Sequence, residues 1–360
     1  MGEHKRIGIL TSGGDCAGLN AVIRAVTHRA VGSYNWEVLG ILRATYGLMH
    51  HPPQAMKLDR EKVIRALTNA GTMLGTTNKG DPFAFPMPDG TVRDRSEEII
   101  AGYHELGLDA LIGIGGDGSL AILRKLAQQG NINFVGIPKT IDNDVGITEH
   151  SIGFDTAVNI ATEALDRLHF TAASHDRVMI LEVMGRDAGH IAISAGIAGG
   201  ADIILIPEIS YSIDNVCRKI KELQEQGQNF CIVVVSEAVC TEAGDKVECL
   251  VSFGERRYGG IGHYLAESIS AASGAETRVT VLGHTQRGGT PSPLDRLIAS
   301  AFGVAAVDLI ANEEYDRMVT WQNRQVMSVP IAEAISQYQA VDPKGTLVKT
   351  ARGLGICLGD

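Results

Sequence analysis

Residues 110–129 read ALIGIGGDGSLAILRKLAQQ, an apolar run followed by a glycine-rich turn and a mixed polar and apolar segment. The apolar run is short and rich in isoleucine and leucine, which is typical of a strand that is buried on both faces. The segment after the turn repeats apolar residues three and four apart, which predicts an amphipathic helix. The stretch therefore predicts the strand, turn and helix unit from which parallel α/β sheets are built.

Other stretches of the chain repeat this unit. RIGIL at 6–10 leads to TSGGDCAGLN and a helical pattern, VMILEV at 178–183 leads to MGRDAG, and VTVLG at 279–283 leads to HTQRGGTPSP and a second helical pattern. The units before and after about residue 150 indicate two similar doubly wound domains with mostly parallel sheets, whose unusual loops face one cleft. Residues 76–96 are rich in proline, glycine and polar residues, which predicts a surface loop or lid.

Composition and charge narrow the class of protein. The chain has 360 residues, of which 44% are hydrophobic, so it is long enough for two domains with sizeable cores. A net charge of −10 and only 5% aromatic residues argue against nucleic acid or an anionic membrane as the main partner. The six cysteines form no CxxC pair and are interpreted as reduced thiols, and no apolar run is long enough to span a membrane. These features predict a cytoplasmic protein.

The turn at residues 113–118, GIGGDG, matches the glycine pattern of dinucleotide-binding proteins. The charge of Asp117 would however face the pyrophosphate, and the next strand ends at Lys139 rather than at an acid for the ribose. An acid in such a turn is tolerated when a divalent cation lies between it and phosphate oxygens. The turn therefore favours a polyphosphate with Mg²⁺, while a dehydrogenase and an ordinary tight turn stay open as alternatives.

Two further loops follow predicted strands. Residues Ser12 to Asp15 form a second glycine-rich turn, whose small residues would let backbone N–H groups approach a phosphate closely. Residues 137–145, IPKTIDNDV, place Asp142 and Asp144 directly after a buried strand, with Lys139 before them. Carboxylates this close are costly in a loop that only reverses the chain, which indicates a catalytic or metal-binding role.

Two pairs of arginines, nine residues apart, bracket predicted strands: Arg177 with Arg186, and Arg278 with Arg287. At about 3.3 Å per residue the two ends of such a strand lie roughly 25–30 Å apart, so one member of each pair falls at the carboxyl edge and the other at the far edge. The far pair, Arg177 and Arg278, either forms surface ion pairs or reaches the site of a neighbouring subunit. Guanidinium groups bind phosphate in a bidentate manner, which suggests a phosphorylated small substrate. Two further candidates at strand ends are Glu237, as an acceptor from sugar hydroxyls, and His284, as a donor to phosphate.

Taken together, four motifs resemble the 6-phosphofructokinase family: GGDGS at 115–119, PKTIDND at 138–144, MGR at 184–186 and GHTQRGG at 283–289. The resemblance runs from TSGGD at 11–15 through the helix after Pro293. It implies a homotetramer in which ATP–Mg²⁺ phosphorylates the 1-hydroxyl of fructose 6-phosphate. It also implies a nucleotide-binding domain over 1–153 and about 286–336, and a sugar-phosphate-binding domain over 154–285 and about 337–360, with the active site in the cleft between them.

The resemblance assigns roles to residues by matching position. Asp142 would be the general base and would contact the sugar together with Thr140, while Asp117 and Asp144 would engage Mg²⁺. Arg186 would face the transferred phosphoryl group as well as the sugar. The remaining sugar-phosphate ligands would be Met184, Gly185, Glu237, His284 and Arg287, with Arg177 and Arg278 lent by the adjacent subunit. The phosphates of ATP would lie along Gly13, Asn78, Lys79, Gly116, Asp117, Gly118 and Ser119.

The chain departs from the family pattern at three places. Lys139 is shared with pyrophosphate-using relatives, but these carry a second aspartate where this chain has Gly118, and a glycine there leaves room for the phosphates of a nucleotide. ATP is therefore the favoured donor, with pyrophosphate and ADP as alternatives. Asn78, followed by Lys79, replaces the usual phosphate-bridging arginine. Arg24 matches one arginine of the bacterial effector site, but His28 stands where that site has another, so regulation by ADP or phosphoenolpyruvate does not follow from the resemblance. A non-catalytic regulatory subunit is a further alternative.

Overall fold

The computed structural model describes residues 4–250 and 256–360. The chain divides into two compact units, each with its own sheet. Unit 1 contains the chain up to Thr140, together with Val145–Asp155 and Arg287–Tyr338, and unit 2 contains Ile141–Asp144, Thr156–Gln286 and Gln339–Asp360. The assignment of a nucleotide to one unit and a sugar phosphate to the other stays a prediction.

Unit 1 is built on a seven-stranded sheet of order β15-β14-β7-β6-β1-β2-β3. The five inner strands run parallel, and β3 and β15 pair antiparallel at the two edges. The strands are β1 (Arg6–Thr11), β2 (Glu37–Ile41), β3 (Ala55–Leu58), β6 (Ala110–Gly115), β7 (Phe134–Pro138), β14 (Arg317–Gln322) and β15 (Gln325–Pro330).

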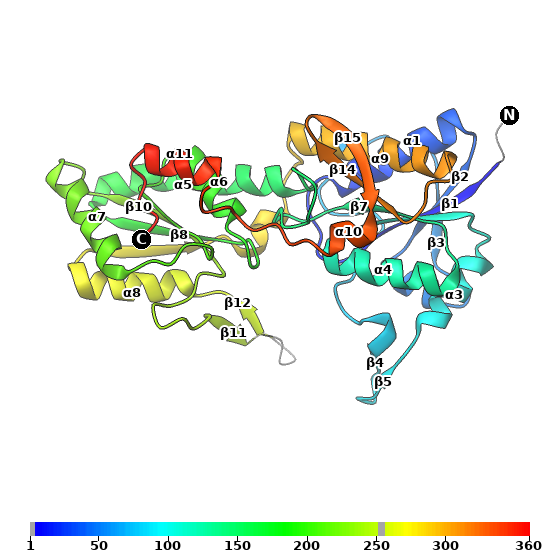
Figure 1. Ribbon diagram of the computed structural model, residues 1–360, viewed down its shortest axis with the longest axis horizontal. Helices are drawn as coiled ribbons and strands as arrows, with labels where there is room; N and C mark the ends of the chain where they lie inside the picture. The colour runs from blue at the N-terminus through cyan, green and yellow to red at the C-terminus, as the bar shows by residue number, and fades with distance from the viewer. Residues whose placement is uncertain (1–3, 251–255) are drawn as a thin grey trace. The chain divides into compact units, whose positions relative to one another are not determined.

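Helices cover both faces of this sheet (Figure 1). Helix α1 (Leu19–Ser33) packs against α9 (Pro293–Ala311) on one face, and α3 (Ser96–Glu105), α4 (Asp117–Gly130) and α10 (Ile331–Ile335) lie on the other. The short helix α2 (Tyr46–Met49) packs against α3. The segment predicted as a loop contains only the turn η2 (Pro82–Ala84) and the small hairpin of β4 (Phe85–Pro86) and β5 (Val92–Arg93); a second turn, η1, spans Ala66–Thr68.

Unit 2 has a four-stranded, fully parallel sheet of order β13-β8-β10-β9. Its strands are β8 (Val178–Val183), β9 (Ile203–Leu205), β10 (Cys231–Ser236) and β13 (Thr277–Val281). Helices α7 (Ile213–Glu225) and α8 (Ile261–Ser273) lie on one face, and α6 (His190–Ala198), α5 (Phe154–His175) and α11 (Thr346–Gly353) lie on the other. A hairpin of β11 (Glu248–Leu250) and β12 (Arg256–Tyr258) precedes α8, and the turn η4 (Gly283–Arg287) follows β13.

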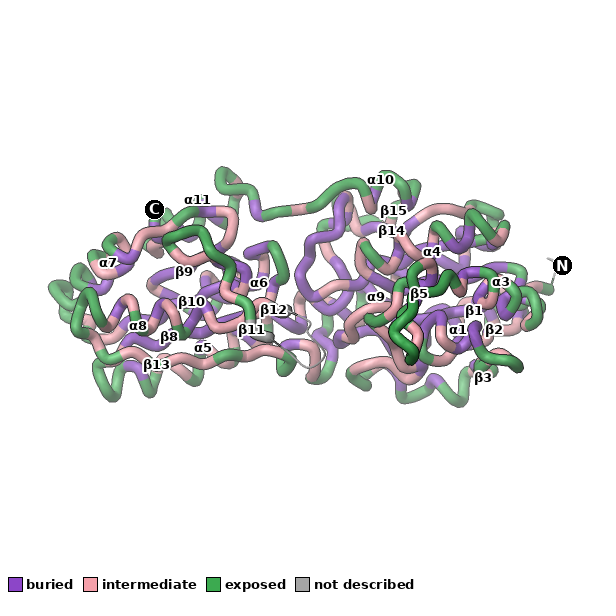
Figure 2. The backbone as a smooth tube through the Cα atoms, turned by 90° about the horizontal axis from the view of Figure 1, so that it is seen from below, coloured by how far each residue is buried: buried purple, intermediate pink, exposed green. Residues whose placement is uncertain are grey.

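The predicted α/β class with mostly parallel sheets is confirmed. The inner strands are continuous apolar runs because helices bury them on both sides, and Figure 2 shows β8, β9 and β10 as buried. The cysteines whose side chains are described, Cys16, Cys217, Cys231, Cys240 and Cys357, are free, as interpreted from the sequence, and the side chain of Cys249 lies outside the described part. Within the described ranges, every helix is too short or too polar to cross a membrane.

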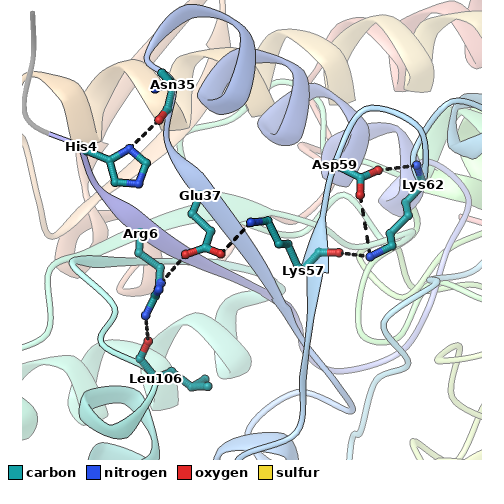
Figure 3. A network of polar contacts seen from close by, with 8 residues as sticks. All are labelled: His4, Arg6, Asn35, Glu37, Lys57, Asp59, Lys62 and Leu106. Atoms are coloured by element: carbon teal, nitrogen blue, oxygen red, sulfur yellow. Dashed lines mark hydrogen bonds and ion pairs between the residues drawn. The ribbon is translucent and has the colours of Figure 1, made fainter.

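Charged side chains join β1, β2 and β3 of unit 1 at one end of the sheet (Figure 3). Glu37 on β2 accepts from Arg6 Nε on β1 at 2.5 Å and pairs with Lys57 Nζ on β3 at 3.1 Å, and Arg6 Nη1 donates to the carbonyl of Leu106 at 3.0 Å. The hydrogen bonds from Arg6 and Lys57 lower the pKa of Glu37. This network lies at the edge opposite to the glycine turns, so we interpret it as structural support for the sheet.

Candidate functional site

The first glycine turn of unit 1 follows β1 and is held by its own backbone. The N–H of Ser12 donates to the carbonyl of Ile114 at 2.8 Å, and the N–H of Gly13 donates to the carbonyl of Thr77 at 2.9 Å. Thr76 Oγ1 donates to the carbonyl of Gly13 at 2.7 Å. These two amides therefore fix the turn, and the predicted amide contacts to phosphate cannot come from Ser12 or Gly13 in this conformation.

The second glycine turn opens helix α4. Gly116 is the N-cap residue and has extended backbone angles, no side chain caps the helix, and Asp117 lies in the first turn. A helix N-terminus of this kind attracts anions through its N–H groups and its dipole. A Cβ atom added at Gly118 would meet nothing within 4 Å, so the space above this residue is open.

The two glycine turns and two cationic side chains meet in unit 1. Gly13 has φ +83°, and a Cβ atom built on it would lie 3.0 Å from Ser119 Oγ and 3.4 Å from Lys139 Nζ. The buried Lys139 donates from Nζ to the carbonyl of Gly14. Arg287 Nη1 donates to the carbonyl of Asp15 at 3.2 Å and would lie 2.8 Å from a Cβ atom at Gly14. An ammonium and a guanidinium over two glycine turns form a suitable cradle for a polyphosphate.

Unit 1 carries two further candidate features. Asn78 and Lys79 are exposed, and they follow Thr77, whose carbonyl holds the first turn. A pocket of about 550 Å³ lies between α2 and the β4–β5 hairpin. The residues that line this pocket were not predicted from the sequence. They are Tyr46, Met49, His50, Phe85, Pro86, Met87, Pro88 and Arg95. The Tyr46 and Phe85 rings meet edge to face with centroids 5.4 Å apart.

In unit 2, the loop after β7 carries the two predicted carboxylates. Asp142 and Asp144 are 7% and 4% exposed, and Asn143 between them takes the left-handed conformation with φ +54°. The carboxylate of Asp144 lies 3.9 Å from Arg186 Nη1, and its carbonyl accepts from the N–H of Gln339 at 3.0 Å. Thr140, the last residue of unit 1 before this loop, is partly exposed.

The loop at the carboxyl end of β8 is held by two side chains from neighbouring strand ends. Glu237 Oε1 accepts the N–H groups of Gly185 at 3.2 Å and Arg186 at 3.0 Å. Gln286 Oε1 accepts the N–H of Met184 at 2.7 Å. Glu237 therefore positions residues 184–187, the arginine loop. Gln286, which is 1% exposed, was not predicted as a site residue, although it stands inside the motif GHTQRGG.

Burial, together with the charges of Asp142 and Glu182, raises the pKa of Glu237 to about 7, in spite of these backbone hydrogen bonds. Because the folded pKa exceeds the usual 4.5, the folded protein binds the extra proton and loses stability as the pH rises from about 4.5 through about 7. We expect Glu237→Gln to remove this dependence. Chemical denaturation from about pH 5 to 8 should show a stability difference from wild type that grows with pH and levels off above about 7. A difference that is constant with pH would contradict the shifted pKa.

Arg177 and Arg278 lie at the opposite, amino edge of the unit 2 sheet, as their spacing predicted. Arg177 Nε donates to Glu276 Oε1 at 2.9 Å, and Arg278 pairs with the same oxygen. Hydrogen bonding to Arg177 lowers the pKa of Glu276. Within one subunit the two arginines thus form surface ion pairs on the edge strand β13 and the start of β8. His284, by contrast, is exposed at the carboxyl edge in the η4 turn.

Comparison with known proteins points to one family. A family model described as phosphofructokinase matches residues 6–310. Curated proteins named ATP-dependent 6-phosphofructokinase 1, from Synechocystis sp. and Nostoc sp., are 73% and 72% identical to this chain over 360 residues. Both alignments cover the whole of this chain and the whole of the relative. Among solved structures, a pyrophosphate-dependent phosphofructokinase from Marinobacter aquaeolei has a TM-score of 0.81 at 20% identity. The match covers 99% of this chain and 92% of the chain in that structure. At that identity the likeness shows the fold alone.

Proposed function

The chain belongs to the phosphofructokinase family, and we propose that it transfers a phosphoryl group from ATP to the 1-hydroxyl of fructose 6-phosphate. The products are fructose 1,6-bisphosphate and ADP, as in glycolysis. One observation from the structure supports this most: the two glycine turns of unit 1 converge under Lys139, an arrangement that suits the phosphates of the donor, and Arg287 beside the first turn adds a cationic group for the substrate phosphate. A cytoplasmic location stays a prediction.

Two features of unit 1 support a nucleotide over pyrophosphate as the donor. The space above Gly118 is open, so nothing in this unit fills the volume that a nucleotide's phosphates would need. The pocket beside the β4–β5 hairpin offers the Tyr46 and Phe85 rings and the Arg95 guanidinium, 5.0 Å from the Phe85 ring. A planar, partly apolar adenine suits such a lining, whereas pyrophosphate has no group that would use it.

The catalytic roles follow the chemistry of in-line phosphoryl transfer, in which positioning and charge neutralisation carry most of the catalysis. Asp142 takes the proton from the 1-hydroxyl as that oxygen attacks. Arg186, held by Glu237 through its backbone N–H, faces the charge that develops on the transferred phosphoryl group. Thr140, Met184, Gly185, His284 and Arg287 orient the sugar phosphate, and Gly13, Asn78, Lys79, Gly116 and Ser119 line the donor.

The carboxylates proposed for Mg²⁺ are Asp117 and Asp144. Mg²⁺ prefers hard oxygen ligands and is usually bound by one or two carboxylates together with substrate phosphates, rather than by a cage of protein side chains. Asp117 stands in the first turn of α4, partly exposed, where phosphate oxygens would complete the coordination. When bound, the ion would neutralise charge on the phosphates; the protein's part is to supply the two carboxylates.

The experiment that tests this function measures fructose 1,6-bisphosphate directly. Purified protein is incubated with fructose 6-phosphate, Mg²⁺ and one donor at a time: ATP, ADP or pyrophosphate. We expect turnover with ATP. Turnover with pyrophosphate in place of ATP would reassign the donor, and no turnover with any of the three would favour a non-catalytic regulatory subunit.

We also propose a homotetramer in which Arg177 and Arg278 reach the sugar-phosphate site of the adjacent subunit. Both side chains lie at the exposed edge of the sheet, far from the carboxyl edge of their own subunit, which supports a contribution across an interface. Surface ion pairs such as those to Glu276 contribute only about 0–1 kcal/mol, so exchanging that partner for a phosphate costs little.

Hybrid oligomers test whether the arginines are lent. Subunits carrying Asp142→Asn are combined with subunits carrying both Arg177→Ala and Arg278→Ala, each with a different affinity tag. If each site uses its own Asp142 and the neighbour's arginines, the purified hybrids regain activity that both parent proteins lack. Hybrids in which every subunit carries Asp142→Asn serve as the control and should stay inactive. Mixed hybrids as inactive as their parents would contradict the proposal.

A further inference from the structure

Between β10 and α8, the described residues 237–250 and 256–260 form a segment outside the sheet of unit 2. A turn closes its near end. There the N–H of Thr241 donates to the carbonyl of Asp245 at 2.8 Å, and the backbones of Cys240 and Lys246 form an antiparallel β-bridge. At its far end the N–H groups of Gly260 and Gly262 donate to Glu182 at 3.1 Å and 2.9 Å. Glu182 is 2% exposed and lies on β8, the strand that leads into the arginine loop. The segment is therefore anchored to that strand.

Two side chains of this segment converge on Asp187, the residue that follows Arg186. The Tyr258 hydroxyl donates to Asp187 Oδ1 at 2.6 Å, and Lys246 Nζ donates to the same oxygen at 3.1 Å. Lys246 Nζ also contacts the Tyr258 hydroxyl and lies 4.6 Å from the centre of its ring. The hydrogen bond to Asp187 raises the pKa of Tyr258.

The arginine loop needs such support because its backbone is unusual. Arg186 has φ +52°, a left-handed conformation that is unfavourable for a residue with a Cβ atom. Glu237 holds the loop through the N–H groups of Gly185 and Arg186, and Asp144 pairs with the guanidinium at 3.9 Å. Asp187, held by Tyr258 and Lys246, fixes the next residue along the chain, so the loop is restrained on both sides of Arg186.

We infer that Asp187, Tyr258 and Lys246 are positioning residues, which hold Arg186 in the orientation needed to face the transferred phosphoryl group. Asp187 and Lys246 are about half exposed, and exposed ion pairs add little to stability, so the value of the contact lies in geometry. A misplacement of about 1 Å in a catalytic group can lower the rate by up to about a hundredfold. The inference rests on the proposed function.

The test compares Tyr258→Phe and Asp187→Asn with wild type, using fructose 6-phosphate and ATP–Mg²⁺. We expect each variant to lower kcat about tenfold while the KM for fructose 6-phosphate changes less than about threefold, because only a group that acts in the transition state loses its position. Tyr264→Phe on α8 is the matched control and should leave kcat unchanged. Melting temperatures of the variants show whether they are folded, and both changed side chains lie near the surface.

A double-mutant cycle separates positioning of Arg186 from a general loss of structure. In an Arg186→Lys background the Tyr258→Phe change should have no further effect on kcat, because the group that it positions is already lost. The inference is overturned if folded Tyr258→Phe and Asp187→Asn keep wild-type kcat, or if the tenfold loss persists in the Arg186→Lys background. If wild type itself shows no turnover, both the proposed function and this inference are wrong. If wild type turns over and the variants keep its kcat, only the inference is wrong.

Discussion

Asp142→Asn is expected to lower kcat by about 10²–10⁴-fold while fructose 6-phosphate binding remains measurable, because general-base catalysis by a positioned side chain typically contributes that much. Asparagine keeps the size of the side chain, which matters because Asp142 is 7% exposed and truncation to alanine would leave a cavity. The amide cannot accept the proton of the 1-hydroxyl. Steady-state kinetics with ATP give kcat, and calorimetry with fructose 6-phosphate alone gives its Kd.

The control for this prediction is Asp166→Asn, which removes an exposed carboxylate on α5 of the same unit and should leave both quantities unchanged. Two outcomes would contradict the assignment in different ways. Near-normal turnover would mean that another group, or water, takes the proton. A loss of sugar-phosphate binding equal to the loss of turnover would make Asp142 a substrate ligand rather than the base.

The parts of the fold that the sequence predicted are those set by local pattern. Continuous apolar runs such as VMILEV are buried strands, and the glycine turns after RIGIL and ALIGI lie at strand ends as expected. The edge strands β3 and β15 were not predicted, because edge strands pack on fewer sides. Helix α5 was not predicted either, although its buried residues Ala157, Ala161 and Leu165 recur at helical spacing. Their positions depend on tertiary contacts that a local pattern does not contain.

For the candidate site, the sequence predicted which residues carry charge but not what holds them. The positions of Asp142, Asp144 and Arg186 followed from loop chemistry, and the far-edge position of Arg177 and Arg278 followed from strand length. The contacts from Glu237 and Gln286 to the backbone of residues 184–186 were not foreseeable, because each joins residues 51 or more apart in the chain. The hydrogen bond from the Gly13 N–H to the carbonyl of Thr77 was not foreseeable for the same reason, because it too joins residues far apart in the chain.

Gly118→Asp is expected to lower kcat/KM for ATP by roughly 10²–10³-fold, because two like charges about 4 Å apart near a protein surface repel by about 4 kcal/mol. The fold should tolerate the change. A Cβ atom at this position meets nothing within 4 Å, the backbone is not left-handed, and an acid in the first turn of α4 is favourable to the helix by about 0.3–1 kcal/mol. A melting temperature equal to or above that of wild type would support this point.

The matched control is Gly118→Asn, which has the same volume as the aspartate variant but no charge. If repulsion of the donor phosphates is the cause, the asparagine variant keeps most of its activity with ATP and the aspartate variant does not. Equal losses in both variants would make the effect steric, which would still place the donor at this turn. Full activity of the aspartate variant with ATP would move the nucleotide away from the start of α4, and the convergence of Ser119 and Lys139 over Gly13 would then need another ligand.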